Sequence, residues 1–258
     1  MNFNSREIFQ MIIKYLKIFK LINWSWILIL LNGCASLPDN QKDPSDPFES
    51  YNRVMYKFND TVDETVLKPV AHGYQKITPE PIDRGITNFF ANLKDVTSAA
   101  NNLLQLKISR SASDMGRVVI NSTIGMLGLI DVASTANLPS YKEDFGQTLG
   151  YWGVEPGPFI IVPLWGPSDL RDSIGMIPDW YTQPISYLKD AKTSASLIAL
   201  YSIDMRADLL EASKTFDEAA LDRYTFTRDA YLQKRQNDVY DGNVPTIEEE
   251  NDEEKNNL

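Results

Sequence analysis

Residues 144–175 read DFGQTLGYWGVEPGPFIIVPLWGPSDLRDSIG, and no other part of the chain has a comparable composition. They hold six of the thirteen glycines and four prolines, interleaved with large apolar side chains: Tyr151, Trp152, Phe159, Ile160, Ile161, Val162, Leu164 and Trp165. Glycine permits backbone conformations that are closed to other residues, and proline fixes φ and removes a donor. The pattern predicts an ordered loop packed against apolar groups, and a buried turn cluster is the alternative.

The first 33 residues have the pattern of an export signal. Basic residues at 6, 14, 17 and 20 precede an apolar run from Leu21 to Leu31, which suits a signal peptide but is too short to span a bilayer. The basic region is long, so Met1 and Met11 both stay open as the translation start. We expect the segment 1–33 to be removed from the mature protein.

The only cysteine, Cys34, follows Leu31-Asn32-Gly33, which resembles a bacterial lipobox whose cysteine becomes the acylated amino terminus. Asn32 departs from the small or β-branched residue usual at its position, and a plain signal peptide with an incidental thiol is the alternative. The residue after the cysteine is Ala35 and not an aspartate, which by resemblance to bacterial lipoprotein sorting patterns favours the outer membrane as the location. The segment 34–47 is rich in proline and acidic residues, so we expect an acylated, solvated tether.

The segment 48–236 predicts an all-α domain, because apolar residues recur at helical spacing and strand alternation is scarce. We expect helices from Phe48 to Pro69, from Ile82 to a break or kink near Asp95, from Val96 to Leu106, from Ser111 or Ser113 to Ser122, from Asp190 to Leu210 and from Leu221 to Arg235. The apolar stripe of the first helix, which includes Phe58, fits either a core or a lipid interface.

Residues 124–130 are apolar on all sides and contain Gly125 and Gly128. Small residues at this spacing allow close backbone approach, which predicts a buried hairpin or a re-entrant segment sheltered at membrane depth.

Charge excludes nucleic acid as a partner. The net charge is −10, and it becomes −13 once residues 1–33, with four basic residues and one acidic residue, are removed. Phosphate binding requires a concentrated basic face, and the remaining basic residues are scattered. The segment 237–258 is acidic and poor in bulky apolar residues, so we expect it to be disordered.

Several motifs, taken together and in this order, resemble the MlaA (VacJ) family of outer-membrane phospholipid-transport lipoproteins. They are Asp46 to Arg53 with Met55, Phe58 and Asn59, then Asn121 to Asp131, Phe145 to Gly150, Gly157-Pro158, Val162 to Ser168 and Leu170 to Asp172. The resemblance runs from Cys34 to about Gln236.

This resemblance implies a ring- or disc-like bundle of amphipathic helices in the outer membrane, lipid-anchored and facing the periplasm. It further implies that phospholipids misplaced in the outer leaflet enter the ring and pass to a soluble periplasmic carrier, with an outer-membrane porin as partner and an inner-membrane ATPase completing the pathway. The candidate residues for the lipid route are Phe58, Asn59, Gly125, Gly128, Gly150, Trp152, Pro163, Trp165, Gly166, Arg171 and Asp172. For Arg171 and Asp172 a structural ion pair is the alternative to a headgroup contact.

No catalytic or metal-binding pattern is recognisable. His72 is the only histidine, the nearest approach to a nucleophile elbow, Gly166-Pro-Ser-Asp-Leu, fails at its last position, and no Walker-type glycine loop is present. We therefore expect no cofactor other than the acyl chains on Cys34, no metal and no enzymatic activity. A structural lipoprotein that scaffolds an outer-membrane protein without moving lipid is the alternative function, and a lipase is a third.

Overall fold

The structure is a computed structural model, and it describes residues 43–245 apart from the side chains of 216–219. The predicted signal peptide, Cys34, most of the tether and residues 246–258 lie outside the described residues. In chain order the elements are α2 (Glu49–Val62), a π-helical turn η2 (Asp63–Leu67), α3 (Lys68–Ile77), α4 (Glu80–Leu104), α5 (Ile108–Thr123), α6 (Val132–Thr135), α7 (Phe145–Tyr151), β1 (Phe159–Val162), β2 (Gly166–Asp169), α8 (Leu170–Thr182), a 3-10 helix η3 (Pro184–Tyr187), α9 (Ala191–Asp208), α10 (Leu210–Ala219) and α11 (Arg223–Val239).

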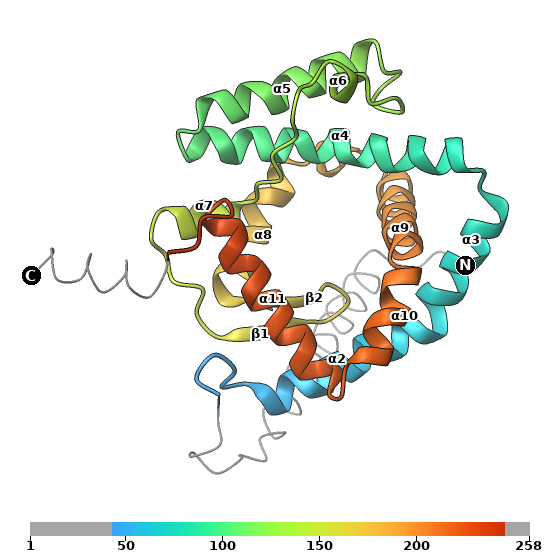
Figure 1. Ribbon diagram of the computed structural model, residues 1–258. Helices are drawn as coiled ribbons and strands as arrows, with labels where there is room; N and C mark the ends of the chain where they lie inside the picture. Colours follow the sequence, from blue (N-terminus) through green and yellow to red (C-terminus); the bar gives the residue numbers. More distant parts are fainter. Residues whose placement is uncertain (1–42, 246–258) are drawn as a thin grey trace, which may run out of the picture.

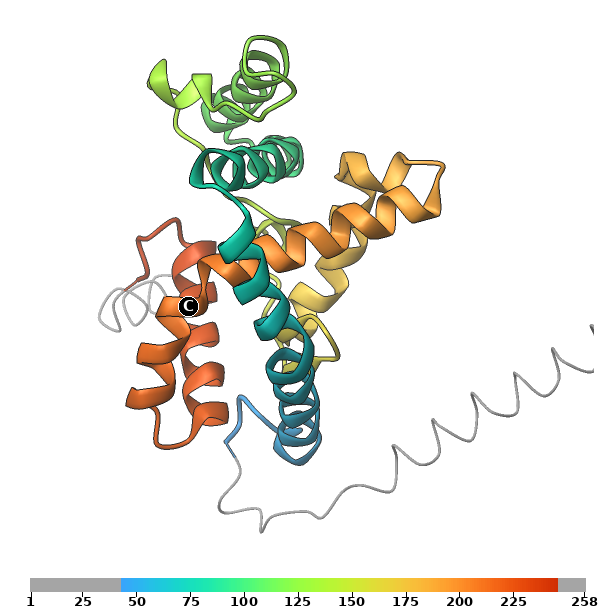
Figure 2. The ribbon, with the colours of Figure 1, turned by 90° about the vertical axis from the view of Figure 1, so that its right-hand side faces the viewer.

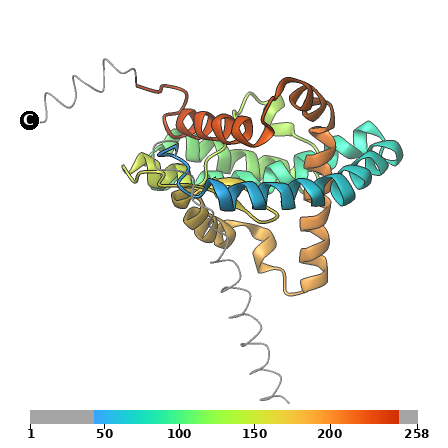
Figure 3. The ribbon, with the colours of Figure 1, turned by 90° about the horizontal axis from the view of Figure 1, so that it is seen from below.

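The helices are arranged in a ring (Figure 1), in which α4 packs on α5 and α3 packs on α9, which is far from it in sequence. Figures 2 and 3 show the ring edge-on: α10 and α11 lie on one face, while the end of α8, η3 and the start of α9 project from the opposite face. The predicted all-α, ring-like architecture is confirmed.

The sheet is a single antiparallel hairpin in which Phe159 of β1 lies opposite Asp169 of β2 and Val162 opposite Gly166. The prediction of one ordered loop over residues 144–175 is corrected here, since these residues form α7, the hairpin and α8. Both helices begin at an aspartate, because the side chains of Asp144 and Asp169 accept hydrogen bonds from the backbone of their first turns.

The sequence predicts that the first helix ends at Pro69, and the structure shows that it does not. The chain stays helical from α2 to Ile77, and the π-helical turn η2 precedes the proline, with the backbone N–H of Lys68 donating to the carbonyl oxygen of Asp63. Pro69 then lies in the first turn of α3. A wider helical turn before a proline can accommodate the missing N–H donor, and the clash of the proline ring with the preceding turn, that would otherwise break the helix.

The expected break near Asp95 is also absent, and α4 is one continuous helix of 25 residues. No glycine or proline lies near Asp95. The apolar stripe is interrupted there because Asn92, Asp95 and Asn102 are buried, while Leu103 and Leu104 are exposed. The polar residues that interrupt the pattern form the packed face of the helix.

The ordered domain extends beyond both expected boundaries. At its start Asp46 is buried and accepts hydrogen bonds from Asn52 and from the hydroxyl of Tyr224 on α11. At its end α11 continues to Val239, and Asp241 forms ion pairs with Lys107 and Arg110. The tether and tail assignments are therefore corrected for residues 43–46 and 237–241, since Asp43, Asp46 and Asp241 have fixed partners and α11 extends to Val239.

Candidate functional site

The interior of the described chain is more polar than its surface. Twenty-one polar or charged residues are buried in the described residues against ten apolar ones, and the two apolar clusters are small. The larger cluster consists of Phe159, Ile161 and Tyr224, with partly buried apolar neighbours. Buried charges are costly unless they are paired and hydrogen-bonded, so the polar contacts must hold this fold together.

Arg117 on α5 organises the polar contacts between α4, α5 and the segment after α5. Its Nε donates to Asp95 at 2.9 Å, one Nη lies 3.1 Å from Asp131, and the other donates to the carbonyl oxygen of Leu138 at 2.8 Å. Although burial raises the pKa of Asp131, hydrogen bonds from Ser134 and other neighbours outweigh it and lower that pKa to about 2.

The opposite sides of the same helices are apolar and exposed. On α4 and α5 they carry Leu103, Leu104, Ile108, Met115 and Val119. The turn that follows α5 exposes Ile124, Met126, Leu127, Leu129 and Ile130, and Leu127 is 71% exposed. On the side where α8 and η3 project, the exposed residues are Ile174, Ile177, Trp180, Tyr181, Tyr187 and Leu188. Apolar surface this extensive marks an interaction site rather than a water-exposed exterior.

A second polar cluster joins α7, α8 and α11. Arg235 of α11 donates two hydrogen bonds to Asp144, at 2.7 and 2.9 Å, and its Nε pairs with Asp172. The hydroxyl of Tyr231 donates to the same Asp172 at 2.6 Å. Although burial raises the pKa of Asp144, the hydrogen bonds and charge of Arg235 outweigh it and lower that pKa.

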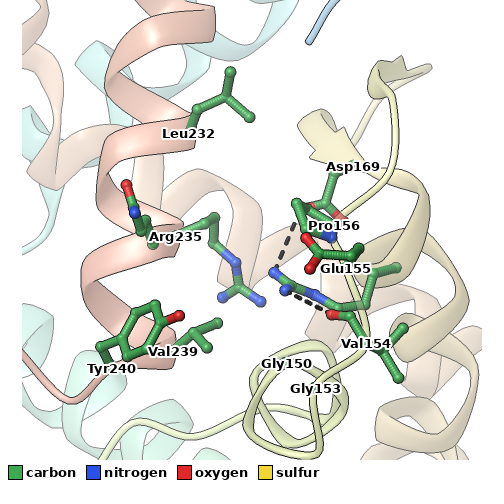
Figure 4. A pocket seen from close by; sticks show the side chains of 12 residues that line it. Gly150, Gly153, Val154, Glu155, Pro156, Asp169, Leu232, Arg235, Val239 and Tyr240 are labelled. Atoms are coloured by element: carbon green, nitrogen blue, oxygen red, sulfur yellow. Dashed lines mark hydrogen bonds and ion pairs between the residues drawn. The ribbon is translucent and has the colours of Figure 1, made fainter. Parts of the chain in front are cut away.

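A cavity of about 400 Å³ opens beside this cluster, and Figure 4 shows Arg235 pointing into it across from Glu155 and Pro156. Arg171 also lines the cavity and is only 7% exposed. Its Nε donates to Asp172 at 3.1 Å, and one Nη lies 3.5 Å from Asp169. Of the two alternatives for Arg171 and Asp172, their contacts fit the structural ion pair.

The second cavity lies among α4, α8, α9 and the segment before α7, and has a volume of about 440 Å³. Its lining residues are Thr87, Phe90, Ala91, Lys94, Asp95, Thr97, Ser98, Ser140, Lys142, Glu143, Asp144, Asp179, Gln183, Tyr201, Asp204, Met205 and Asp208. Burial raises the pKa of Asp179 to about 6 and also raises the pKa values of Asp204 and Asp208.

Two asparagines of α2 hold the outer edge of the hairpin. The side chain of Asn52 donates to the carbonyl oxygen of Phe159 at 3.0 Å and accepts from the backbone N–H of Ile161 at 2.8 Å. Asn59 makes the same pair of contacts nearer the hairpin tip: its side chain donates to the carbonyl oxygen of Val162 at 3.1 Å and accepts from the backbone N–H of Leu164 at 2.8 Å. A side-chain amide offers the same donor and acceptor as a peptide group, so these residues replace a missing third strand.

The predicted route residues fall in three places rather than one. Asn59, Pro163, Trp165 and Gly166 gather at the hairpin tip, where Trp165 is 70% exposed, and Phe58 is exposed on the neighbouring α2. Trp152, also exposed, stacks edge-on against Phe145, while Gly150, Arg171 and Asp172 lie in the α7–α8–α11 cluster.

Gly125 and Gly128 form the third place, in the turn after α5. A Cβ on Gly125 would lie 2.6 Å from the carbonyl oxygen of Asn121, and a Cβ on Gly128, which has φ +93°, would lie 2.8 Å from the side chain of Asn92 on α4. These close approaches pack the glycine backbone, but the prediction of a buried hairpin is wrong for the apolar side chains, because Ile124, Met126, Leu127, Leu129 and Ile130 are exposed. Whether the turn lines a lipid route stays a prediction.

Sequence reasoning missed the cavity among α4, α8 and α9. Its carboxylates are spread along the sequence from Asp95 to Asp208, and polar residues on amphipathic helices ordinarily form the solvated face. The available signal concerned only the packed faces: the i, i+3, i+7 spacing of Asp114, Arg117 and Asn121, which matches a similar polar stripe on α4.

Within residues 43–245, no helix combines the length and apolar character needed to cross a membrane. In the same residues, no group of three or more histidine, cysteine or acidic side chains is arranged to hold a metal ion.

Comparison with known proteins identifies the family. The family model described as MlaA lipoprotein matches residues 44–238. The intermembrane phospholipid transport system lipoprotein MlaA of Escherichia coli K12 is 35% identical over 209 residues, which cover 80% of this chain and 82% of that protein. The Haemophilus influenzae protein of the same name is 31% identical over 222 residues, covering 84% and 88%.

A solved structure reported as the structural basis for maintenance of bacterial outer membrane lipid asymmetry matches with a TM-score of 0.68 and 35% identity, covering 76% of this chain and 99% of that one. Its fold is thus shared over most of the ring. By the family model, the relatives and the structure alike, this chain belongs to the MlaA lipoprotein family.

Proposed function

We propose that this protein is a lipid-anchored conduit of the outer membrane, which takes phospholipids misplaced in the outer leaflet and passes them to a soluble periplasmic carrier. The observation that carries the proposal is the distribution of polarity, with extensive exposed apolar surface around a polar interior that contains a cavity. The names of the relatives, which describe intermembrane phospholipid transport, support it.

The energetics favour a ring of this kind. A two-chain phospholipid exposes roughly 30 methylenes in water, at ~0.8 kcal/mol each, which amounts to about 24 kcal/mol. Thermal motion does not supply such a barrier energy at a useful rate. A protein without a nucleotide site must therefore keep the acyl chains in contact with apolar surface while the headgroup follows a polar path.

The apolar exterior would lie among lipid tails of the periplasmic leaflet, anchored by acyl chains on Cys34. In that setting the exposed leucines and isoleucines would contact lipid tails instead of water. The buried ion pairs would then stabilise the fold in the way that an apolar core stabilises a water-soluble domain. A porin as membrane partner and a periplasmic carrier as acceptor complete the proposal. No chemistry on the lipid is part of it.

A strain that lacks the gene tests this function. We expect phospholipid to accumulate in the outer leaflet, and phospholipid to co-purify with the detergent-extracted wild-type protein. A deletion strain with normal lipid asymmetry would leave the scaffold as the function. Release of fatty acid from phospholipid by the purified protein would favour the lipase instead.

A further inference from the structure

The cavity among α4, α8 and α9 combines charges that the protein itself does not neutralise. Three of its carboxylates are paired: Asp95 with Arg117, Glu143 with Lys107 and Asp144 with Arg235. The other three are Asp179, Asp204 and Asp208, and none of these forms an ion pair with a cation of the described residues.

Asp204 is the most enclosed of these carboxylates, with 2% of its surface exposed. It accepts hydrogen bonds from the hydroxyls of Tyr74, at 2.8 Å, and Thr87, at 3.2 Å, but no cation compensates its charge. Burial raises the pKa of all three carboxyls, as expected for anions held without a counter-ion. A cationic group entering the cavity would meet negative charge that lacks a partner.

Two lysines line the same cavity, and neither pairs with a carboxylate of the described chain. Lys94 of α4 places its Nζ 5.0 Å from the ring centre of Tyr201 on α9, and Lys142 precedes α7. Phe90, Tyr201 and Met205 supply an apolar wall. The volume of about 440 Å³ lies within the range of small-molecule sites.

We infer that this cavity selects phospholipids whose headgroup carries both a phosphate and a primary ammonium. The ammonium would face Asp179, Asp204 and Asp208, and the phosphate would face Lys94 and Lys142. A phosphoglycerol headgroup has no cation, so it would leave the three carboxylates uncompensated, including the buried Asp204. The inference rests on the proposed function, because it names the class of lipid that the conduit prefers.

The test uses the full-length acylated protein in detergent, equilibrated with vesicles that contain equal amounts of phosphatidylethanolamine and phosphatidylglycerol. The lipid retained by the protein is then extracted and quantified by headgroup. We expect the wild type to retain mostly phosphatidylethanolamine. If it retained no phospholipid, the proposed function would fail; if it retained both lipids equally, only the headgroup inference would fail.

Separate variants test the acidic side and the basic side of the cavity. Asp208→Asn should lower the ratio of phosphatidylethanolamine to phosphatidylglycerol by about tenfold, which corresponds to the loss of one charge-assisted contact. Lys94→Gln should lower the retention of both lipids and leave the ratio unchanged, since both carry the phosphate. Glu211→Gln, on the exposed face of α10, is the matched control and should change neither quantity. An Asp208→Asn protein with the wild-type ratio would overturn the inference.

A water-soluble headgroup distinguishes a lipid from a free metabolite as the ligand. Glycerophosphoethanolamine, at the concentration of the vesicle lipid, should not displace bound phosphatidylethanolamine, because it lacks the acyl chains. Displacement would show that the cavity serves a soluble compound and would overturn the assignment to phospholipid.

Discussion

At the level of single residues, two glycines of α7 allow arginine side chains to reach the helix backbone. A Cβ on Gly150 would lie 2.8 Å from an Nη of Arg171 and 2.9 Å from the methyl groups of Val239. A Cβ on Gly146 would clash with the carboxylate of Asp172 and lie 2.8 Å from an Nη of Arg235. These contacts explain why glycine stands at both positions of a well-formed helix, where it ordinarily costs stability.

Gly150→Ala should therefore lower the free energy of unfolding by about 1–3 kcal/mol, because the new methyl group overpacks the contact between α7, α8 and α11. Gly73→Ala is the control, since Gly73 lies inside α3 with nothing near its Cβ, and this change should stabilise by roughly 0.5–1 kcal/mol. Urea unfolding in detergent measures both. Equal effects in the two variants would contradict the packing explanation.

Asp179 should give the stability a dependence on pH. Burial raises the pKa of its carboxyl from 3.8 to about 6, so the folded state binds a proton more tightly than the unfolded state does. The free energy of unfolding should then fall as the pH rises from about 4 to about 6, by up to about 3 kcal/mol, and stay lower above that range.

Asp179→Asn should remove this dependence, because an asparagine still accepts the hydrogen bonds from Asn101 and the backbone of Phe145 but carries no charge. We expect the variant to match the wild type near pH 4 and to be more stable at pH 7. Glu155→Gln, at an exposed carboxylate, should leave the profile unchanged. A steeper loss of stability in the Asp179 variant would refute this account.

At the level of elements, α4 and α5 pack through their polar faces, and Arg117 is the centre of that contact. It joins Asp95 on α4 to Asp131 and Leu138 after α5. Asp114 on the same face accepts hydrogen bonds from Ser98, at 2.7 Å, and Asn102, at 2.9 Å. Such a seam specifies one alignment of the two helices, because a shift by one residue would leave buried charges without partners.

Arg117→Met should destabilise the protein by about 3–5 kcal/mol, since it leaves the carboxylates of Asp95 and Asp131 without their cation. Hydrogen exchange should show the loss first in residues 131–140. Adding Asp95→Asn to the variant removes one orphaned charge and should restore part of the stability. A double variant less stable than the sum of the single changes would contradict the pairing.

At the level of the whole molecule, the ring is closed where α11 meets the start of the chain. Tyr224, Arg228, Tyr231 and Arg235 lie on one side of α11. Arg228 pairs with Asp43, at the start of the described chain, at 3.0 Å, and Arg235 pairs with Asp144, which begins α7. Cys34 precedes Asp43 by nine residues, which reach at most roughly 30 Å. An acylated Cys34 would therefore hold this corner of the ring close to the membrane.

Cys34→Ser should yield a protein without acyl chains, as mass spectrometry will show, and most of it should be absent from the outer-membrane fraction. The purified variant should still need detergent, because the apolar exterior belongs to the fold and not to the anchor. Ser36→Ala is the control and should fractionate as the wild type does. Full accumulation of the cysteine variant in the outer membrane would show that Cys34 is not the anchor.

The sequence by itself determined the helical class, the positions of most helices and the family, because periodicity and motif order are local properties of the chain. It also located the polar side of α11 and the close-packed glycines of the turn after α5. The tertiary structure decided which side of each helix faces inward. Periodicity reveals two faces of a helix but not the medium that each one meets, so Asp95 interrupts the apolar pattern of the sequence although it lies on the packed side of α4. The cavity of Asp179, Asp204 and Lys94 likewise exists only once α4, α8 and α9 are brought together, since no local pattern links residues so far apart in the chain.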